Sequence, residues 1–123
     1  PEPKSGLGAV TATVQEIPPD LMGLDIGPAS AALFSEALND CSMIVWNGPM
    51  GVFEQEAFAR GTMDVMKKIA DSKALTIVGG GDTDAALHKG NAADKIDFVS
   101  TAGGAFLEML GGTELPGVKA LQR

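Results

Sequence analysis

Three glycine-rich turns, each of which follows a short apolar segment, are the parts of this sequence best suited to chemistry. They occupy residues 47–51, 79–82 and 101–104. A glycine-rich turn that leads into a helix lets backbone N–H groups converge on one point, and the positive end of the helix dipole adds to their attraction for an anion. Glycines also occur wherever a tight connection needs them. Three such turns in succession favour a phosphate-binding role over that simpler interpretation.

Polar side chains beside these turns fit the same chemistry. Asp82 follows three consecutive glycines, a position that suits Mg²⁺, which takes few carboxylates and bridges substrate phosphates. The hydroxyl of Thr83 can donate to a phosphate oxygen. Glu54 can accept from a ribose hydroxyl, as acidic residues do in dinucleotide-binding folds, although an acid at a helix start is also favoured by the dipole alone. The sequence contains neither GxxxxGK[ST] nor a GxGxxG after the first strand, the two standard phosphate-binding motifs. From the residues, the interpretation as a nucleotide site therefore depends on the glycine-rich turns alone.

Composition excludes several classes of protein. The chain has 123 residues, a formal net charge of −7, one Cys and one His. One cysteine cannot form an internal disulfide, and one Cys with one His is too few for a closed zinc site. No apolar run approaches the roughly 20 residues that span a bilayer, and no secretory signal is recognisable. The acidic balance argues against binding nucleic acid through basic patches. We therefore expect neither a membrane nor a nucleic acid as partner.

Hydrophobic patterning predicts strands and helices that alternate along the chain. Short apolar runs predict strands at residues 9–17, 43–46, 74–78 and 96–100. Periodic apolar positions predict helices at residues 28–39, 54–72, 82–88 and 105–110, after a loose arm at 1–8. This order predicts an α/β fold, a Rossmann-like, doubly wound parallel sheet with helices on both faces. All three turns then fall at the carboxyl ends of strands, where such sheets bind ligands.

The helix predicted at 54–72 has the clearest two-sided pattern. Its apolar face comprises Phe58, Thr62, Val65, Met66 and Ile69. Its other face offers opposite charges at i, i+4 spacing, in the pairs Glu56–Arg60, Arg60–Asp64 and Lys67–Asp71. The helix at 82–88 is expected to have Gly81 or Asp82 as its N-cap. Trp46 and Cys41 are expected to be buried packing residues.

Six segments of the chain resemble phosphoglycerate kinase, in the order and at the spacing of its C-terminal, nucleotide-binding domain. They are residues 25–28, 45–54, 56–61, 79–83, 100–105 and 115–118. The sequence WNGPMGVFE at 46–54, followed by GGGDT at 79–83, is the most specific part. The resemblance covers about residues 17–121, and it implies that residues 1–123 are the C-terminal part of that domain, with 9–123 as its α/β core.

The resemblance implies a glycolytic, cytoplasmic enzyme that moves a phosphoryl group between 1,3-bisphosphoglycerate and Mg-ADP, giving 3-phosphoglycerate and ATP. The parent enzyme is expected to be a monomer. Matching residues imply a wall for the adenine at Gly23, Leu24, Met50 and Phe53. Glu54 matches the acid that binds the ribose. The positions that match phosphate contacts are Asn47, Gly48, Gly80, Gly81 and Thr83. Asp82 matches the Mg²⁺-associated aspartate, and Gly103 and Gly104 match the catalytic helix N-terminus that faces the transferring group.

Two departures from the family pattern affect these expectations. Ala102 stands where the family usually has a glycine, which matters only if that position needs a positive φ. The family enzyme is also a longer, two-domain protein, and we expect its N-terminal, 3-phosphoglycerate-binding domain and its phosphate-binding lysines to be absent from this chain. The chain should then bind nucleotide weakly and should not turn over. The alternatives are a stand-alone nucleotide- or phosphate-binding α/β module without catalysis, and a structural piece completed by a partner chain.

Overall fold

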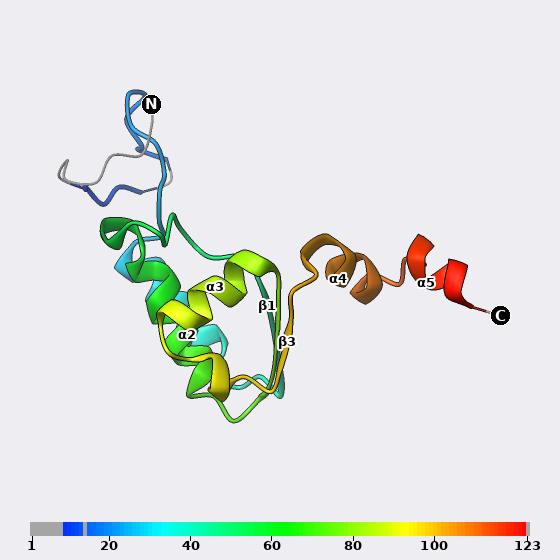
Figure 1. Ribbon diagram of the computed structural model, residues 1–123. Helices are drawn as coiled ribbons and strands as arrows, with labels where there is room; N and C mark the ends of the chain where they lie inside the picture. The colour runs from blue at the N-terminus through cyan, green and yellow to red at the C-terminus, as the bar shows by residue number, and fades with distance from the viewer. Residues whose placement is uncertain (1–8, 14, 123) are drawn as a thin grey trace.

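The computed structural model describes residues 9–13 and 15–122, and it has a three-stranded parallel sheet at its centre (Figure 1). The strands are β1 (Met43–Asn47), β2 (Leu75–Gly79) and β3 (Phe98–Ser100), in the spatial order β1-β2-β3. The helices are α1 (Pro28–Ala37), α2 (Arg60–Ala70), α3 (Gly81–Lys89), α4 (Gly103–Leu110) and α5 (Pro116–Leu121), with 3-10 turns at Glu56–Phe58 and Ala93–Lys95. The predicted α/β class and the parallel sheet are confirmed.

The core lies between one face of the sheet and helices α2 and α3, which Figure 1 shows on the same side of the strands. Because side chains alternate along a strand, each strand sends every second residue to this face. The strands contribute Ile44, Trp46 and Val78, and the helices contribute Val65, Met66, Ile69 and Leu87. The predicted apolar face of α2 is therefore confirmed, as is the burial of Trp46.

The opposite face of the sheet is uncovered along most of its length. Among its side chains, Met43 is 54% exposed and Phe98 is 63% exposed, and Val45 and Leu75 are exposed as well. Only Gly79, at the carboxyl end of β2, is covered there, by Phe106 of α4. The prediction of helices on both faces is therefore met only in part, because among the described residues α4 alone reaches this face, at its carboxyl end. An apolar run shows that a face needs a cover, but it does not show which residues supply one.

The predicted strand at residues 9–17 is wrong for the residues described. Residues 9–13 and 15–17 are not in a strand, while Val14 and the predicted loose arm at 1–8 lie outside the described residues. A strand needs a neighbour whose backbone groups pair with its own, and the sheet of the described chain consists of β1, β2 and β3 alone. The side chain of Val10 is accordingly exposed rather than packed on the sheet.

The single helix predicted at 54–72 is in fact a 3-10 turn at Glu56–Phe58 followed by α2, which begins at Arg60. Phe58 and Ala59 are both buried at this break. Of the three predicted ion pairs, Arg60–Asp64 is present at 3.8 Å. Glu56 lies outside the helix, so its spacing to Arg60 is not that of one helix face.

Two other packing predictions need correction. The carboxylate of Asp71 lies 3.8 Å from the ammonium group of Lys95, in the 3-10 turn that follows α3, rather than pairing with Lys67. Cys41 is exposed, because the residues between α1 and β1 run along the surface. None of the helices in the described part of the chain is long and apolar enough to span a membrane.

Asp97 joins β3 to β2 just before their ladder begins. Its carboxylate accepts hydrogen bonds from the Thr76 N–H at 2.8 Å and the Thr76 hydroxyl at 3.0 Å. The Thr76 hydroxyl accepts in return from the Asp97 N–H at 3.0 Å. These hydrogen bonds, that from the Thr76 backbone first, hold the pKa of Asp97 below its ordinary value. The Asp97–Thr76 pair therefore helps to set the register between β2 and β3.

Candidate functional site

The three glycine-rich turns meet at the carboxyl edge of the sheet, as the sequence predicts. Asn47, Gly79 and Ser100 are neighbours across the three strands in the ladder register. The Gly80 N–H donates to the Ser100 carbonyl at 2.9 Å, which ties the second turn to the third. A Cβ added to Gly103 would lie 3.6 Å from the Gly80 Cα, so the first residue of α4 rests against the second turn. The edge therefore presents the N-terminal ends of α3 and α4 together.

Gly80, rather than the predicted Gly81 or Asp82, is the N-cap of α3. Its φ of 98° and ψ of 140° belong to a region that side chains with a Cβ rarely adopt, so a glycine turns the chain sharply into the helix. The first helical bond runs from the Asp84 N–H to the Gly80 carbonyl. The N–H groups of Gly81, Asp82 and Thr83 precede that bond and have no partner within the helix.

Gly80 and Gly81 consequently differ in what they can offer an anion. The N–H of Gly80 is committed to Ser100, so Gly80 contributes the shape of the turn. Gly81 and Asp82 are exposed at the start of α3, where the helix dipole is most positive. The amides that remain for a ligand are thus those of the first turn of α3.

Asn47, the last residue of β1, has an unused donor at this edge. The Nδ2 of Asn47 is buried and has no hydrogen-bond partner among the described residues. A Cβ added to Gly79 would lie 2.9 Å from that atom, and a Cβ added to Gly80 would lie 3.6 Å from it. A buried donor without an acceptor is costly, and a phosphate oxygen or a water at the turns would satisfy it.

Thr83 fixes the first turn to α3. Its side chain is 1% exposed, and its hydroxyl oxygen accepts from the Gly48 N–H at 2.8 Å. Gly48 itself has a φ of 98°, which explains the glycine at this position. The hydroxyl proton of Thr83 is not used in this bond, so the predicted contact of Thr83 with a phosphate stays a prediction.

The residues predicted for the base and ribose lie around the 47–53 loop. The Leu24 carbonyl accepts from the Val52 N–H at 2.9 Å, which places residues 23 and 24 against that loop. Phe53 is buried with Ala59 and Ala86, so it supports the loop from below rather than lining its surface. The side chain of Glu54 is exposed.

Sequence reasoning missed three residues: Thr62 and Lys89, which hold this loop, and Asp25, which holds the segment beside it to α2. The Lys89 ammonium group donates to the Phe53 carbonyl at 2.5 Å and lies 3.4 Å from the Glu54 carbonyl. In the sequence, Thr62 is only one member of the apolar face of residues 54–72. A single hydroxyl on such a face is the one signal that this residue makes a hydrogen bond. No local signal identifies Asp25 or Lys89, because their partners are 36 residues away or about as far.

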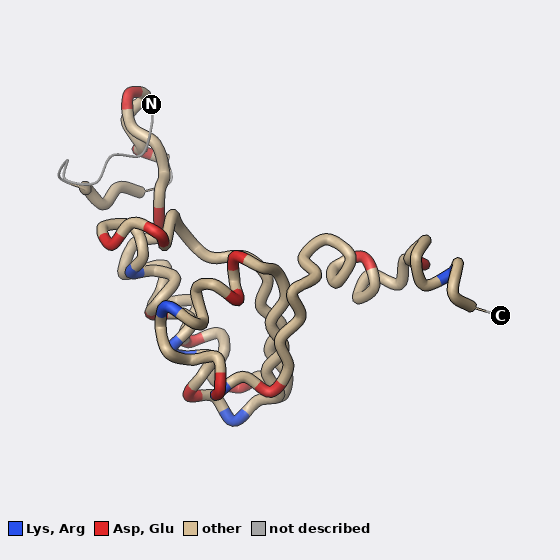
Figure 2. The backbone as a smooth tube through the Cα atoms, in the orientation of Figure 1, with Lys and Arg blue, Asp and Glu red and all other residues tan. Residues whose placement is uncertain are grey.

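Charged side chains at the edge are acidic. Figure 2 shows acidic positions where α3 begins and no basic one beside them, and residues 47–54, 79–84 and 100–104 contain no Lys or Arg. Within the described residues no cluster of three or more His, Cys, Asp or Glu side chains could enclose a metal ion. Asp82 could therefore hold Mg²⁺ only together with ligand phosphates and water, which is the usual coordination of that ion.

The third turn accommodates the departure from the family pattern. Ala102 is the N-cap of α4 and has a φ of −84°, which any residue adopts readily. Gly103 and Gly104 are the first two residues of α4, and a Cβ added to Gly104 would meet nothing within 4 Å. The alanine therefore causes no strain at this turn.

Comparison with known proteins agrees with this geometry. The family described as phosphoglycerate kinase matches residues 3–113. This chain belongs to the phosphoglycerate kinase family. It is 58% identical over 110 residues to phosphoglycerate kinase of Geobacter metallireducens, covering 89% of this chain and 28% of that protein. It is 61% identical over 102 residues to the enzyme of Aquifex aeolicus, covering 83% of this chain and 26% of that one.

Solved structures of phosphoglycerate kinases have the same local fold. The structure from Coxiella burnetii is similar with a TM-score of 0.72 and 52% identity, over 80% of this chain and 26% of that one. The structure from Pyrococcus horikoshii has a TM-score of 0.72 and 47% identity, over 80% of this chain and 24% of that one. The chain spans about 28% of the length of the curated relatives it matches, so what a complete phosphoglycerate kinase does comes to this chain only as a proposal.

Proposed function

We propose that this chain supplies the nucleotide side of a phosphoryl transfer between 1,3-bisphosphoglycerate and Mg-ADP, which gives 3-phosphoglycerate and ATP. The observation that carries the proposal is the convergence of two helix N-termini and the unpartnered Asn47 Nδ2 at one edge of the sheet. Donors without acceptors at such an edge are suited to the oxygens of a polyphosphate. Membership of the phosphoglycerate kinase family supports this choice among phosphate ligands.

The polyphosphate is bound by backbone amides and by Mg²⁺ rather than by cationic side chains. The free N–H groups at Gly81, Asp82 and Thr83 face the phosphates, and Asn47 and Gly48 close the site on the β1 side. Asp82 would hold Mg²⁺ at this edge, and the ion would supply positive charge that offsets the charge of the phosphates. The N-terminus of α4, at Gly103 and Gly104, faces the phosphoryl group that is transferred.

The nucleoside is bound on the outer side of the 47–53 loop. Gly23, Leu24 and Met50 wall the adenine, and Phe53 holds that wall from beneath. The exposed Glu54 carboxylate accepts from the ribose hydroxyls. We propose the cytoplasm as the place of action and 3-phosphoglycerate as a substrate whose own binding groups lie outside these turns.

The 123 residues alone should bind Mg-ADP weakly and should not turn over. Phosphoryl transfer depends on positioning and on electrostatic stabilisation of the transferring oxygens. No Lys or Arg occurs in the three turns, so the cationic part of that stabilisation is missing there. A coupled assay that detected ATP-dependent phosphorylation of 3-phosphoglycerate by this chain would contradict this part of the proposal.

Titration with Mg-ADP, followed by backbone amide NMR, tests the binding site. We expect saturable shifts at Gly81, Asp82 and Thr83 that disappear when EDTA removes Mg²⁺. Asp82→Asn should weaken Mg-ADP binding, whereas Asp94→Asn, on an exposed residue of another segment, serves as the matched control. A dispersed spectrum in which these three amides do not respond to Mg-ADP would refute the proposed site.

A further inference from the structure

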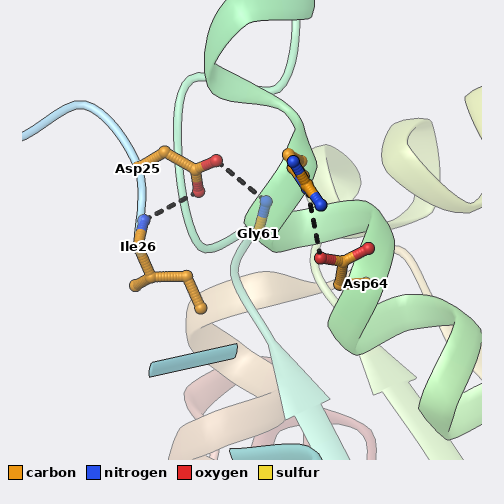
Figure 3. Close-up of polar contacts among 5 residues, drawn as sticks. Asp25, Ile26, Gly61 and Asp64 are labelled. Atoms are coloured by element: carbon orange, nitrogen blue, oxygen red, sulfur yellow. Dashed lines mark hydrogen bonds and ion pairs between the residues drawn. The ribbon is translucent and has the colours of Figure 1, made fainter. Parts of the chain in front are cut away.

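The start of α2 receives its cap from a residue far away in the sequence. Its own N-cap, Ala59, has no side chain that can accept a hydrogen bond. Instead the Asp25 carboxylate accepts from the Gly61 N–H at 2.8 Å through Oδ2, and from the Ile26 N–H at 2.8 Å through Oδ1 (Figure 3). A carboxylate at a helix N-terminus is favoured by the free N–H groups and by the dipole. The segment that contains Gly23 and Leu24 is thereby attached to α2.

The same turn of α2 also holds the 47–53 loop. The Thr62 hydroxyl oxygen accepts from the Met50 N–H at 3.0 Å and from the Gly51 N–H at 3.3 Å. The Thr62 side chain is 0% exposed, so no water can replace it as the acceptor. Leaving two partly buried N–H groups without this partner is costly, and the loop would have to change its path to recover them.

The three segments pack so closely that a side chain at Gly51 or Gly61 would clash with its neighbours. A Cβ added to Gly51 would lie 2.5 Å from Asp25 Oδ1 and 2.6 Å from the Leu24 carbonyl oxygen. A Cβ added to Gly61 would come within 2.4 Å of the same Asp25 oxygen. Asp25, Gly51, Gly61 and Thr62 therefore form one close-packed joint, which we call the α2 joint.

We propose that the α2 joint positions the nucleoside part of the ligand independently of its phosphates, with Thr62 as the positioning residue. The inference rests on the proposed function. Residues 23–24 and Met50, the two sides of the proposed adenine wall, are both attached to the joint. The phosphate edge is held by other contacts, from Gly48 to Thr83 and from Gly80 to Ser100. Damage to the joint should therefore weaken recognition of the base and ribose and leave phosphate recognition intact.

The test compares Mg-ADP with Mg-pyrophosphate, which lacks the nucleoside. Thr62→Val keeps the shape of the side chain and removes the acceptor of the two loop amides. We expect about tenfold weaker binding of Mg-ADP and less than about twofold change for Mg-pyrophosphate. Thr62→Ser, which restores the hydroxyl, should recover most of the Mg-ADP affinity. Thr113→Val, at an exposed threonine outside the joint, is the matched control and should change neither.

A second readout follows the loop without any ligand. Trp46 is the only tryptophan, and its indole N–H donates to the Gly48 carbonyl at 2.7 Å, so its emission reports on this loop. In Thr62→Val we expect a changed Trp46 emission and faster hydrogen exchange at the amides of Met50 and Gly51. If Thr62→Val does not fold, Asp25→Asn, which keeps the size of the side chain and removes its charge, is compared in the same way.

The possible outcomes separate the two proposals. If the unmodified chain binds neither Mg-ADP nor Mg-pyrophosphate, the proposed function fails, and the positioning role of Thr62 fails with it. If the chain binds Mg-ADP and Thr62→Val binds it equally well, only the positioning role is refuted. Equal loss of Mg-ADP and Mg-pyrophosphate in the variant also refutes it, because the α2 joint would then support the fold as a whole.

Discussion

Gly79→Ala is the substitution whose effect follows most directly from the packing at the carboxyl edge. A Cβ at this position would lie 2.2 Å from Cδ1 and 2.5 Å from Cε1 of Phe106, and 2.9 Å from the Asn47 Nδ2. Phe106 is buried and is the residue through which α4 covers the sheet, so its ring must move by about 1 Å or more to reach ordinary van der Waals contact. The movement would carry the start of α4, including Gly103, away from the second turn.

The magnitude follows from the cost of overpacking a filled site, which is about 1–3 kcal/mol. For a chain of this size, each kcal/mol lowers the melting temperature by about 4 °C, so a decrease of about 4–12 °C is expected. Mg-ADP binding should weaken as well, because the α4 N-terminus would no longer lie against Gly80. Differential scanning calorimetry and the NMR titration measure the two effects.

Gly81→Ala is the matched control two residues further on. A Cβ there would meet nothing within 4 Å, and Gly81 is the first residue of α3. Alanine at a position compatible with its backbone stabilises by about 0.4–1 kcal/mol, so Gly81→Ala should melt at the same temperature or slightly higher. A Gly79→Ala variant as stable as Gly81→Ala, with unchanged amide shifts in α4, would show that the Phe106 contact does not constrain the edge.

Two further substitutions test the contacts that hold the strands and the loop. The pKa of Asp97 is lowered by its hydrogen bonds from Thr76, so the stability that Asp97 contributes is present above its ordinary pKa and is lost as pH falls through the lowered value. Asp97→Asn should lower the urea midpoint at pH 7 and should flatten the decrease of that midpoint below about pH 5. Parallel curves of urea midpoint against pH for the variant and the unmodified chain would contradict this. Lys89→Met removes the hydrogen bond to the Phe53 carbonyl and should lower the free energy of unfolding by about 1 kcal/mol. Lys73→Met, at an exposed lysine, is the control and should not change the urea midpoint. Equal urea midpoints for the two variants would refute the role of Lys89.

The sequence was sufficient for features that depend on neighbouring residues. The strands at β1, β2 and β3, the helices that follow them and the three turns all come from short patterns of apolar residues and glycines. Apart from the start of α2, the structure has them within a few residues of the prediction. Parallel pairing then brings the turns to one edge without further information. The meeting of the three turns at one edge was therefore predictable.

The features that were missed depend on tertiary contacts. Asp25 caps a helix that begins 35 residues later, and nothing near Asp25 in the sequence indicates it. The break at Ala59 interrupts a periodic pattern that reads as one helix. The same argument applies to the uncovered face of the sheet, since an apolar strand looks the same in sequence whether or not another element covers it.

The charge distribution at the carboxyl edge determines which form of the nucleotide can bind. The N-termini of α3 and α4 contribute roughly +0.5 charge each, and Asp82 and Asp84 in the first turn of α3 contribute two negative charges. The edge is therefore close to −1 before a ligand arrives, and a free polyphosphate would be repelled. A Mg²⁺ ion held by Asp82 would make the balance positive and would favour the binding of phosphates. Affinity for ADP should accordingly depend on Mg²⁺ far more than on ionic strength, because the attraction arises from fixed amides and one shared ion rather than from a field of exposed cations. A titration in which ADP bound equally well with EDTA present would show that the Mg²⁺ and the Asp82 carboxylate do not act together in this way.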